Sequence, residues 1–135
     1  MKKIILCITL FAFTQATFAQ KAKHSKVPDA VKIAFAKAYP ETDDIDWSKE
    51  GNNYEAEFDV AGGKEMSVVY DANGGLLETE MPIAFSELPK AAQAALKGKK
   101  VKETAKITNA KGVVTYEAEV KHKDLMFDAQ GNPVK

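Results

Sequence analysis

Arginine is absent from this 135-residue chain, and cysteine and histidine are nearly absent: Cys7 is the single cysteine, and His24 and His122 are the histidines. Arginine is the usual residue for bidentate contacts with phosphate, so its absence argues against nucleic-acid binding. A zinc site needs about four closely spaced nitrogen or sulfur ligands, which these three residues do not supply. With one cysteine, the chain cannot form an internal disulfide.

Long apolar segments are also lacking. The strongest apolar run, 4–13, is shorter than the roughly 20 residues that span a bilayer. Two lysines precede it, and a small-x-small triplet follows at 17–19. This three-part pattern is typical of a secretory signal peptide, and we prefer that interpretation to a buried N-terminal helix. We therefore expect residues 1–19 to be removed, Cys7 with them, and 20–135 to act in the periplasm as one domain without a membrane span.

The charge of the chain is balanced overall but is divided unequally along it. Residues 27–80 contain 4 lysines and 13 acidic residues, whereas 88–135 contain 10 lysines and 5 acidic residues. Such a division can steer a charged partner or order self-association. Simple attraction between the two halves explains it equally well.

Three short blocks of sequence occur twice, in the same order. The paired blocks are 27–30 with 88–91, 54–58 with 116–120, and 70–74 with 127–131. The second copy is shorter because 121–123 replaces a longer turn that contains Gly62 and Gly63. Matched blocks in one order indicate an internal duplication, with repeats at 27–80 and 88–135.

Each copy begins with a predicted helix. Apolar residues recur at helical spacing over 27–39, and Pro40 ends this segment. The second helix, over 88–96, has a thinner, alanine-rich face. Ser86 is its expected N-cap and Gly98 its expected C-cap.

Strands follow each helix. Apolar and charged residues alternate strictly over 54–60 and 116–121, which predicts strands with one buried face and one charged face. Segments 71–75 and 128–132 have the composition of hairpin turns. Shorter strands are expected at 45–48, 66–70, 76–79, 105–108 and 125–127. Each repeat is therefore one helix followed by about four antiparallel strands, an α+β arrangement, with 81–87 linking the copies.

The residues of the first copy resemble a known family. The pattern Val-Pro-x-Ala-Val-x-x-Ala-Phe-x-x-x-Tyr-Pro at 27–40, then Trp47, 54–58 and Tyr70-Asp71-x-x-Gly74, is similar to the PepSY-like family of small periplasmic Bacteroidetes proteins. Those proteins are described as similar to the β-lactamase inhibitor protein. The second copy departs from the pattern, because it lacks the Tyr-Pro pair and the tryptophan.

The resemblance implies a fold and, more weakly, a function. It implies two helix-plus-four-strand repeats side by side, forming one antiparallel sheet with both helices packed on one face. It carries over no catalytic residue. PepSY domains are proposed to inhibit or regulate peptidases, so a non-catalytic inhibitory or regulatory role is implied here.

Catalytic groups are sparse. His122 lies between two lysines in a predicted turn, which favours a solvated surface residue. Ser25, Ser48, Ser67 and Ser86 each lack the context of a nucleophile elbow. We expect no enzymatic activity, no catalytic residue and no cofactor.

Two acidic segments could suggest a cation site. Asp43, Asp44 and Asp46 cluster before a predicted strand, and 71–74 resembles a fragment of a calcium loop. A calcium site needs about six oxygen ligands, and Asp, Asn and Gly favour turns for local reasons. We interpret both segments as turns and loops and expect no metal site.

The charged face of the predicted sheet is the candidate binding surface. Glu55, Glu57, Asp59, Glu117 and Glu119 alternate with the buried residues and should point away from the helices. We expect them to line one exposed surface that contacts an unidentified protein partner. An antiparallel sheet can also leave one face in water, in which case these carboxylates only confer solubility.

Three functions remain, in order of preference. The first is a periplasmic module that binds, and inhibits or regulates, a protein such as a peptidase through the sheet face. The second is a small-ligand or cation-binding periplasmic protein. The third is a weak hydrolase.

Overall fold

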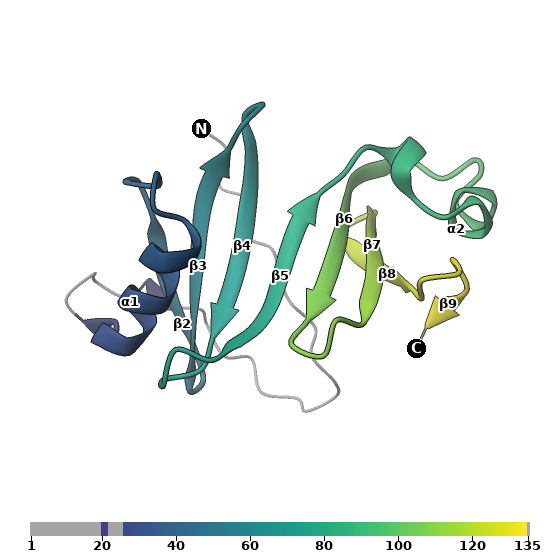
Figure 1. Ribbon diagram of the computed structural model, residues 1–135. Helices are drawn as coiled ribbons and strands as arrows, with labels where there is room; N and C mark the ends of the chain where they lie inside the picture. Colours follow the sequence, from purple (N-terminus) through teal and green to yellow (C-terminus); the bar gives the residue numbers. More distant parts are fainter. Residues whose placement is uncertain (1–19, 22–25, 135) are drawn as a thin grey trace.

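The computed structural model describes residues 20–21 and 26–134; the expected signal peptide, Cys7 and His24 lie outside them. The described chain is mostly β, an open antiparallel sheet with few helices (Figure 1). No helix within the described residues is both long enough and apolar enough to cross a membrane.

The sheet is continuous, and its strands follow one another in chain order from β1 to β9. The helices are α1 (Asp29–Ala38) and α2 (Lys90–Ala95), with a 3₁₀ turn, η2 (Phe85–Glu87), before the second. The strands are β1 (Gln20–Lys21), β2 (Asp46–Glu50), β3 (Asn53–Val60), β4 (Lys64–Tyr70), β5 (Leu76–Pro82), β6 (Val101–Asn109), β7 (Val114–Val120), β8 (Lys123–Phe127) and β9 (Pro133–Val134).

The two halves of the chain join in the middle of this sheet. Strand β5 pairs with β6 from Glu78 opposite Asn109 to Pro82 opposite Ala105. The residues alone do not determine whether the halves share one sheet, although the resemblance implies it; the structure shows that they do. Each half runs as one α-helix followed by four strands, although β9 has two residues; the internal duplication itself stays a prediction.

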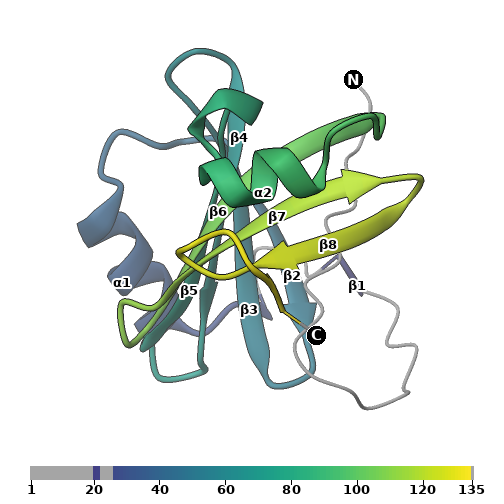
Figure 2. The same cartoon turned by 90° about the vertical axis from the view of Figure 1, so that its right-hand side faces the viewer.

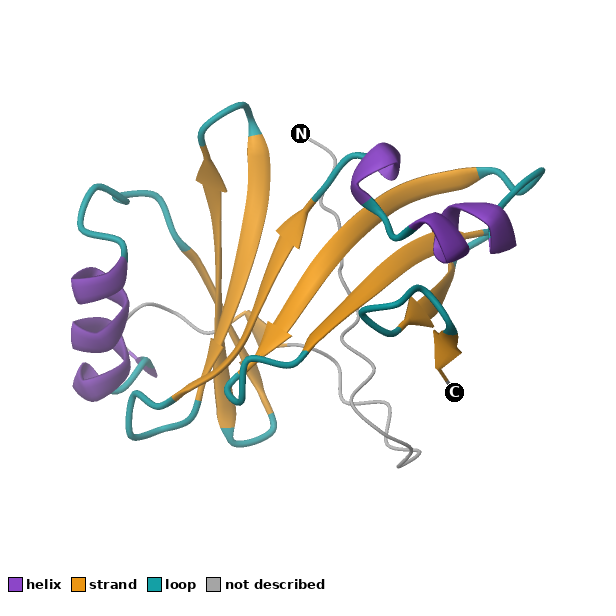
Figure 3. Cartoon of the chain, turned by 45° about the vertical axis from the view of Figure 1, so that its right-hand side comes forward, coloured by secondary structure: helices purple, strands orange, loops and turns teal. Residues whose placement is uncertain are grey.

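Both helices pack against the same side of the sheet, at its two ends (Figures 1 and 3). Helix α1 packs against residues of β2 to β4, and α2 lies over β6 and β7, as a view from the side shows (Figure 2). Pro28 precedes α1 and Pro89 precedes α2, as suits a residue that donates no backbone N–H.

The predicted start of the second helix is wrong. Ser86 does not cap α2, because Ser86 lies within the 3₁₀ turn η2 and Pro89 stands at the helix N-cap. The side-chain amide of Gln93 instead donates hydrogen bonds to the carbonyl oxygens of Ser86 and Leu88. These bonds tie the turn to the helix.

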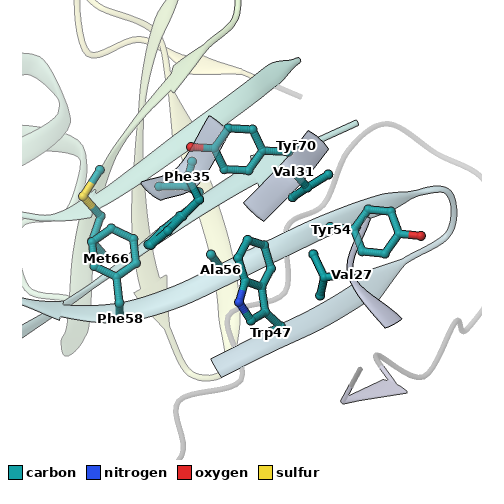
Figure 4. Packing of buried hydrophobic residues seen from close by; sticks show 10 residues of the cluster. Val27, Val31, Phe35, Trp47, Tyr54, Ala56, Phe58, Met66 and Tyr70 are labelled. Carbon is teal, nitrogen blue, oxygen red and sulfur yellow. The ribbon is translucent and has the colours of Figure 1, made fainter. Parts of the chain in front are cut away.

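Two clusters of buried side chains form the core, one under each helix. The larger cluster joins Val31 and Phe35 of α1 to Trp47, Ala56 and Phe58 of the sheet (Figure 4). The smaller cluster joins Leu88, Ala92 and Leu96 to Ala118 and Phe127. The alternation that predicted β3 and β7 is confirmed, since their apolar residues face these clusters.

The shortened turn of the second half is a two-residue hairpin. Val120 pairs with Lys123, and the intervening Lys121 and His122 both have positive φ, at 53° and 61°. A two-residue hairpin with positive φ at both positions is the type I′ geometry, which Asn and Gly adopt most readily.

The β4–β5 and β8–β9 turns approach the two helices closely through glycine. A Cβ atom at Gly74 would lie 2.6 Å from the carbonyl oxygen of Ala30, and one at Gly131 would lie 2.7 Å from the nitrogen of Ala92. Both glycines have positive φ, at 83° and 87°. The recurring glycine therefore lets each turn contact its helix.

Replacing Gly74 with alanine should lower the free energy of unfolding by about 2–4 kcal/mol, because strain at positive φ adds to steric overlap with the helix. The matched control is Gly62→Ala, since Gly62 also has positive φ but no described atom lies within 4 Å of its Cβ position. Urea unfolding of both variants measures the difference. Equal losses would show that the turn does not press on α1.

Candidate functional site

The sheet surface opposite α1 and α2, here called the open face, is rich in carboxylates. Cross-strand partners share a face, and the register pairs Glu57 with Ser67, Ser67 with Glu80, and Glu119 with Asp124. The acidic residues placed on this face by the register and the alternation of each strand are Asp46, Glu50, Glu55, Glu57, Asp59, Glu65, Glu78, Glu80, Glu103, Glu117, Glu119 and Asp124.

All five predicted contact residues lie on the open face, but they do not form one exposed row. Asp59 is exposed, and Glu57 and Glu119 are half-buried. Glu55 and Glu117 are buried, so the expectation that they line an exposed surface is wrong. Both lie on strands flanked on each side by further strands, and neighbouring side chains cover them.

Glu55 has a structural role. Its carboxylate accepts hydrogen bonds from the hydroxyls of Ser48 on β2 and Ser67 on β4. A buried carboxylate is tolerated when hydrogen bonds replace water. Glu55 therefore ties three strands together on the open face.

Glu57 and Glu117 are held in surroundings that disfavour their charged forms. Burial, followed by the nearby carboxylates of Glu55 and Glu65, raises the pKa of Glu57 to about 7. Burial and the carboxylate of Asp124 are the leading causes that raise the pKa of Glu117 to about 7. These carboxyls change charge near neutral pH rather than near pH 4.5.

Glu119 lies beside two basic side chains. Lys102 Nζ lies 2.9 Å from Glu119 Oε2, and His122 Nδ1 lies 3.5 Å from Glu119 Oε1. The His122 side chain is 91% exposed, so its contact with Glu119 is a surface contact of small energy.

Glu80 is the functional candidate that the sequence analysis missed. It is 2% exposed, and neither carboxylate oxygen has a hydrogen-bond partner within the described residues. Burial raises its pKa to about 9, and the carboxylates of Glu117 and Glu78 add to this effect. The predicted strand ended at 79, whereas β5 continues through Pro82 and brings Glu80 to the centre of the sheet.

A pocket of about 750 Å³ opens beside Glu80. Glu57 and Glu117 also line it, so the pocket brings together two predicted contact residues and the one that was missed. Met66, Ile83 and Phe85 supply apolar walls. A concave site with apolar walls and a few polar groups is the usual form of a binding pocket.

The two acidic segments considered as cation sites form turns and loops. Oδ1 of Asp71 accepts hydrogen bonds from the backbone N–H groups of Asn73 and Gly75, at 2.8 and 2.9 Å. Asp43 and Asp44 are exposed in the loop before β2. Within the described residues, no group of three or more His, Cys, Asp or Glu side chains is arranged to hold a metal ion.

Comparison with known proteins finds likeness in structure rather than in sequence. No family model matches the chain, and no curated protein matches it significantly. A BLIP-like protein from Bacteroides fragilis is similar at 26% identity and a TM-score of 0.64, over 80% of this chain and 84% of that one.

Other solved structures share the fold at lower identity. A candidate periplasmic protein from Bacteroides eggerthii matches with 21% identity and a TM-score of 0.72, over 81% of this chain and 86% of that one. A DUF2874 family protein from Bacteroides uniformis matches with 22% identity and a TM-score of 0.70, over 80% and 86%. These matches support the BLIP-like part of the expected resemblance; the PepSY-like part stays a prediction.

Proposed function

We propose that this protein is an exported, non-catalytic module of the periplasm that binds, and inhibits or regulates, a protein partner through the open face. The gathering of carboxylates on one side of the sheet carries the proposal. The raised pKa values of Glu57 and Glu117 reflect first their burial and then repulsion between neighbouring carboxylates in the free protein. A partner that brings positive charge to this face would relieve the repulsion.

The likeness to a BLIP-like protein supports an inhibitory role, and the likeness to a candidate periplasmic protein supports export through a signal peptide at 1–19. The five predicted residues form the contact region in this proposal. Glu57, Asp59 and Glu119 would touch the partner, because water reaches them in the free protein. Glu55 and Glu117 would shape the surface beneath.

Neutralising the accessible carboxylates should abolish capture of the partner. The variant combines Glu57→Gln, Asp59→Asn and Glu119→Gln, and chain 20–135 serves as bait in a crosslinking pull-down from the periplasm of the source organism. The matched control combines Glu41→Gln, Asp43→Asn and Asp44→Asn, which removes three exposed carboxylates outside the open face.

Loss of one captured protein from the first variant, with retention by the control, supports the proposal. If both variants capture the same proteins as the wild type, the open face is a solvated surface.

The second candidate function, binding of a small ligand, is supported by the pocket beside Glu80. A rise in melting temperature with a screened compound, in the absence of a protein partner, would favour it.

A further inference from the structure

The pocket lies where two neighbouring strands separate. Strands β4 and β5 pair from Tyr70 opposite Leu76 as far as Ser67 opposite Glu80. Beyond this point Lys64–Met66 stay with β3, whereas Met81 and Pro82 stay with β6. The upper parts of β4 and β5 diverge accordingly (Figure 1). The sheet is therefore forked, and the pocket fills the fork.

The pocket is lined both by apolar side chains and by carboxylates. Met66 on β4 and Ile83 after β5 present apolar surface, and Phe85 adds an aromatic ring that is 41% exposed. Glu80 and Glu117 are buried on the open face at the base of the fork, with Glu57 beside them. The pocket therefore offers a ligand both apolar surface and carboxylates.

Glu80 is an unsatisfied group at the base of the fork. Both of its carboxylate oxygens are buried without a hydrogen-bond partner in the described chain. Buried polar side chains in folded proteins nearly always have a partner, and an exception calls for an explanation. An absent binding partner is one such explanation. Glu80 lines the pocket, but both of its oxygens are covered in the free protein, so neighbouring side chains must move to admit that partner.

We propose that the fork receives an arginine or lysine side chain from the protein partner, whose cationic end pairs with Glu80. This inference rests on the proposed function, because it assumes that a protein binds the open face. A basic side chain has an apolar stem that suits the walls of Met66, Ile83 and Phe85. Its N–H groups would supply the hydrogen bonds that Glu80 lacks, and a guanidinium can donate two at once.

Lysines around the pocket indicate which residues the partner should carry beside its basic side chain. Lys64, Lys99, Lys100 and Lys102 line it and are exposed. Charges next to water interact more weakly than buried charges, so these lysines oppose a bound cation less than ionised buried carboxylates attract it. They would favour acidic residues next to the inserted basic side chain.

Binding should require ionised carboxylates and should therefore be pH-dependent. Glu80 faces carboxylates from several elements: Glu78 on its own strand, Glu55 on β3, Glu117 on β7 and Asp124 on β8. Strand β4 places the uncharged Ser67 opposite it, and β6 adds Lys102 and Glu103 to the pocket lining. A bound cation would stabilise the charged form of Glu80 and release its proton, so binding should strengthen as pH rises towards 9.

The test uses n-propylguanidinium, which reproduces the arginine side chain, and n-propylurea, a neutral molecule of nearly the same shape. Methyl resonances of Met66, Ile83, Val101 and Ala105 report binding, because all four residues line the pocket. We expect saturable shifts of these methyls at pH 9 with a dissociation constant on the order of millimolar, as suits so small a ligand. Affinity at pH 6 should be weaker by about tenfold or more.

Glu80→Gln should abolish the response, and Glu41→Gln should leave it unchanged, because Glu41 is exposed outside the sheet. The Gln variant should fold, since glutamine has nearly the size of glutamate and cannot carry a buried charge at any pH. Equal binding of n-propylurea would overturn the inference, because a protonated Glu80 would then be serving as a hydrogen-bond donor. Preference for butyrate would overturn it as well, because the lysines would then define an anion site.

The outcome separates this inference from the proposed function. If n-propylguanidinium fails to bind while the pull-down yields a partner that depends on the open face, the partner binds without inserting a basic side chain. If n-propylguanidinium binds but no partner is captured, the pocket binds free cations. The proposal that a side chain of a protein partner occupies it is then wrong. Charge reversal of the inserted residue on an identified partner should reduce capture about as much as Glu80→Gln does.

Discussion

Replacing Glu80 with glutamine should stabilise the protein by several kcal/mol at pH 9 and by almost nothing at pH 4. Glutamine has nearly the shape of glutamate and carries no charge at any pH. The variant therefore tests one property, the free energy of holding a carboxylate at this buried position. The direction of the pH dependence follows from the pKa of Glu80, which burial raises from 4.5 to about 9.

Between these two pKa values the folded protein retains a proton that the unfolded chain releases. Stability then falls as pH rises, by up to about 1.4 kcal/mol per pH unit for one group. Below pH 4.5 the carboxyl is protonated in both states, so the full stability is present there. Near pH 9 the folded state must accept a buried charge or unfold. Glu80→Gln removes this loss.

Urea unfolding at pH 4, 6, 7.5 and 9, followed by the fluorescence of Trp47, measures the effect. Stability of the wild type should decline across this range, and that of Glu80→Gln should decline less. Some slope should persist between pH 4.5 and 7, because the pKa values of Glu57 and Glu117 are also raised, to about 7. Glu41→Gln serves as the charge control. Parallel curves for the wild type and Glu80→Gln would mean that folding does not raise the pKa of Glu80.

The strands were predictable where their position depends on the alternation of residues within one short segment. Alternation of apolar and charged residues placed β3 at 54–60, and the structure has it at Asn53–Val60. Likewise, β7 was expected at 116–121 and is found at Val114–Val120. Which face a side chain takes depends on its position along one strand, so the sequence showed that Glu55 and Glu117 oppose the core.

The burial of those carboxylates was not predictable in the same way. Whether a side chain on the open face meets water depends on what lies beside it in the sheet, and therefore on strand order and register. Glu55 is covered because Ser48 and Ser67 stand on the adjacent strands. Asp59, two pairs further along the same strand and face, remains exposed.

Glu80 was missed for a different reason. Met81 and Pro82 follow it, and proline usually indicates the end of a strand. In the folded sheet, β5 extends past this point because its pairing with β6 continues to Pro82 after β4 has separated. The fork that makes the pocket is thus a feature of three strands together, and no single segment of the sequence encodes it.

Replacing Phe35 with alanine should lower the free energy of unfolding by about 3–5 kcal/mol, the usual range for a fully buried phenylalanine. Phe35 is 2% exposed and attaches α1 to the sheet. Its ring centroid lies 5.5 Å from that of Trp47 and 5.0 Å from that of Phe58, with edge-to-face geometry in both cases. Such pairs add to the stabilisation that comes from burial alone.

Ile33→Ala is the matched control, because it shortens an apolar side chain on the same helix. Ile33 is 68% exposed, so its loss should cost about 0.5 kcal/mol or less. Urea unfolding of both variants, monitored by Trp47 fluorescence and by far-ultraviolet circular dichroism, gives the comparison. A similar loss from both variants would place Phe35 outside the core.

The two signals also test whether the chain is one cooperative domain. The buried clusters under α1 and α2 are separate, but the pairing of β5 with β6 joins them through continuous backbone hydrogen bonds. In a single domain, Phe35→Ala lowers the midpoint of both signals equally, although dichroism also reports strands far from Phe35. If Trp47 fluorescence shifts while most of the dichroism keeps its wild-type midpoint, the two halves unfold separately. The fork beside Glu80 would then lie close to the boundary between them.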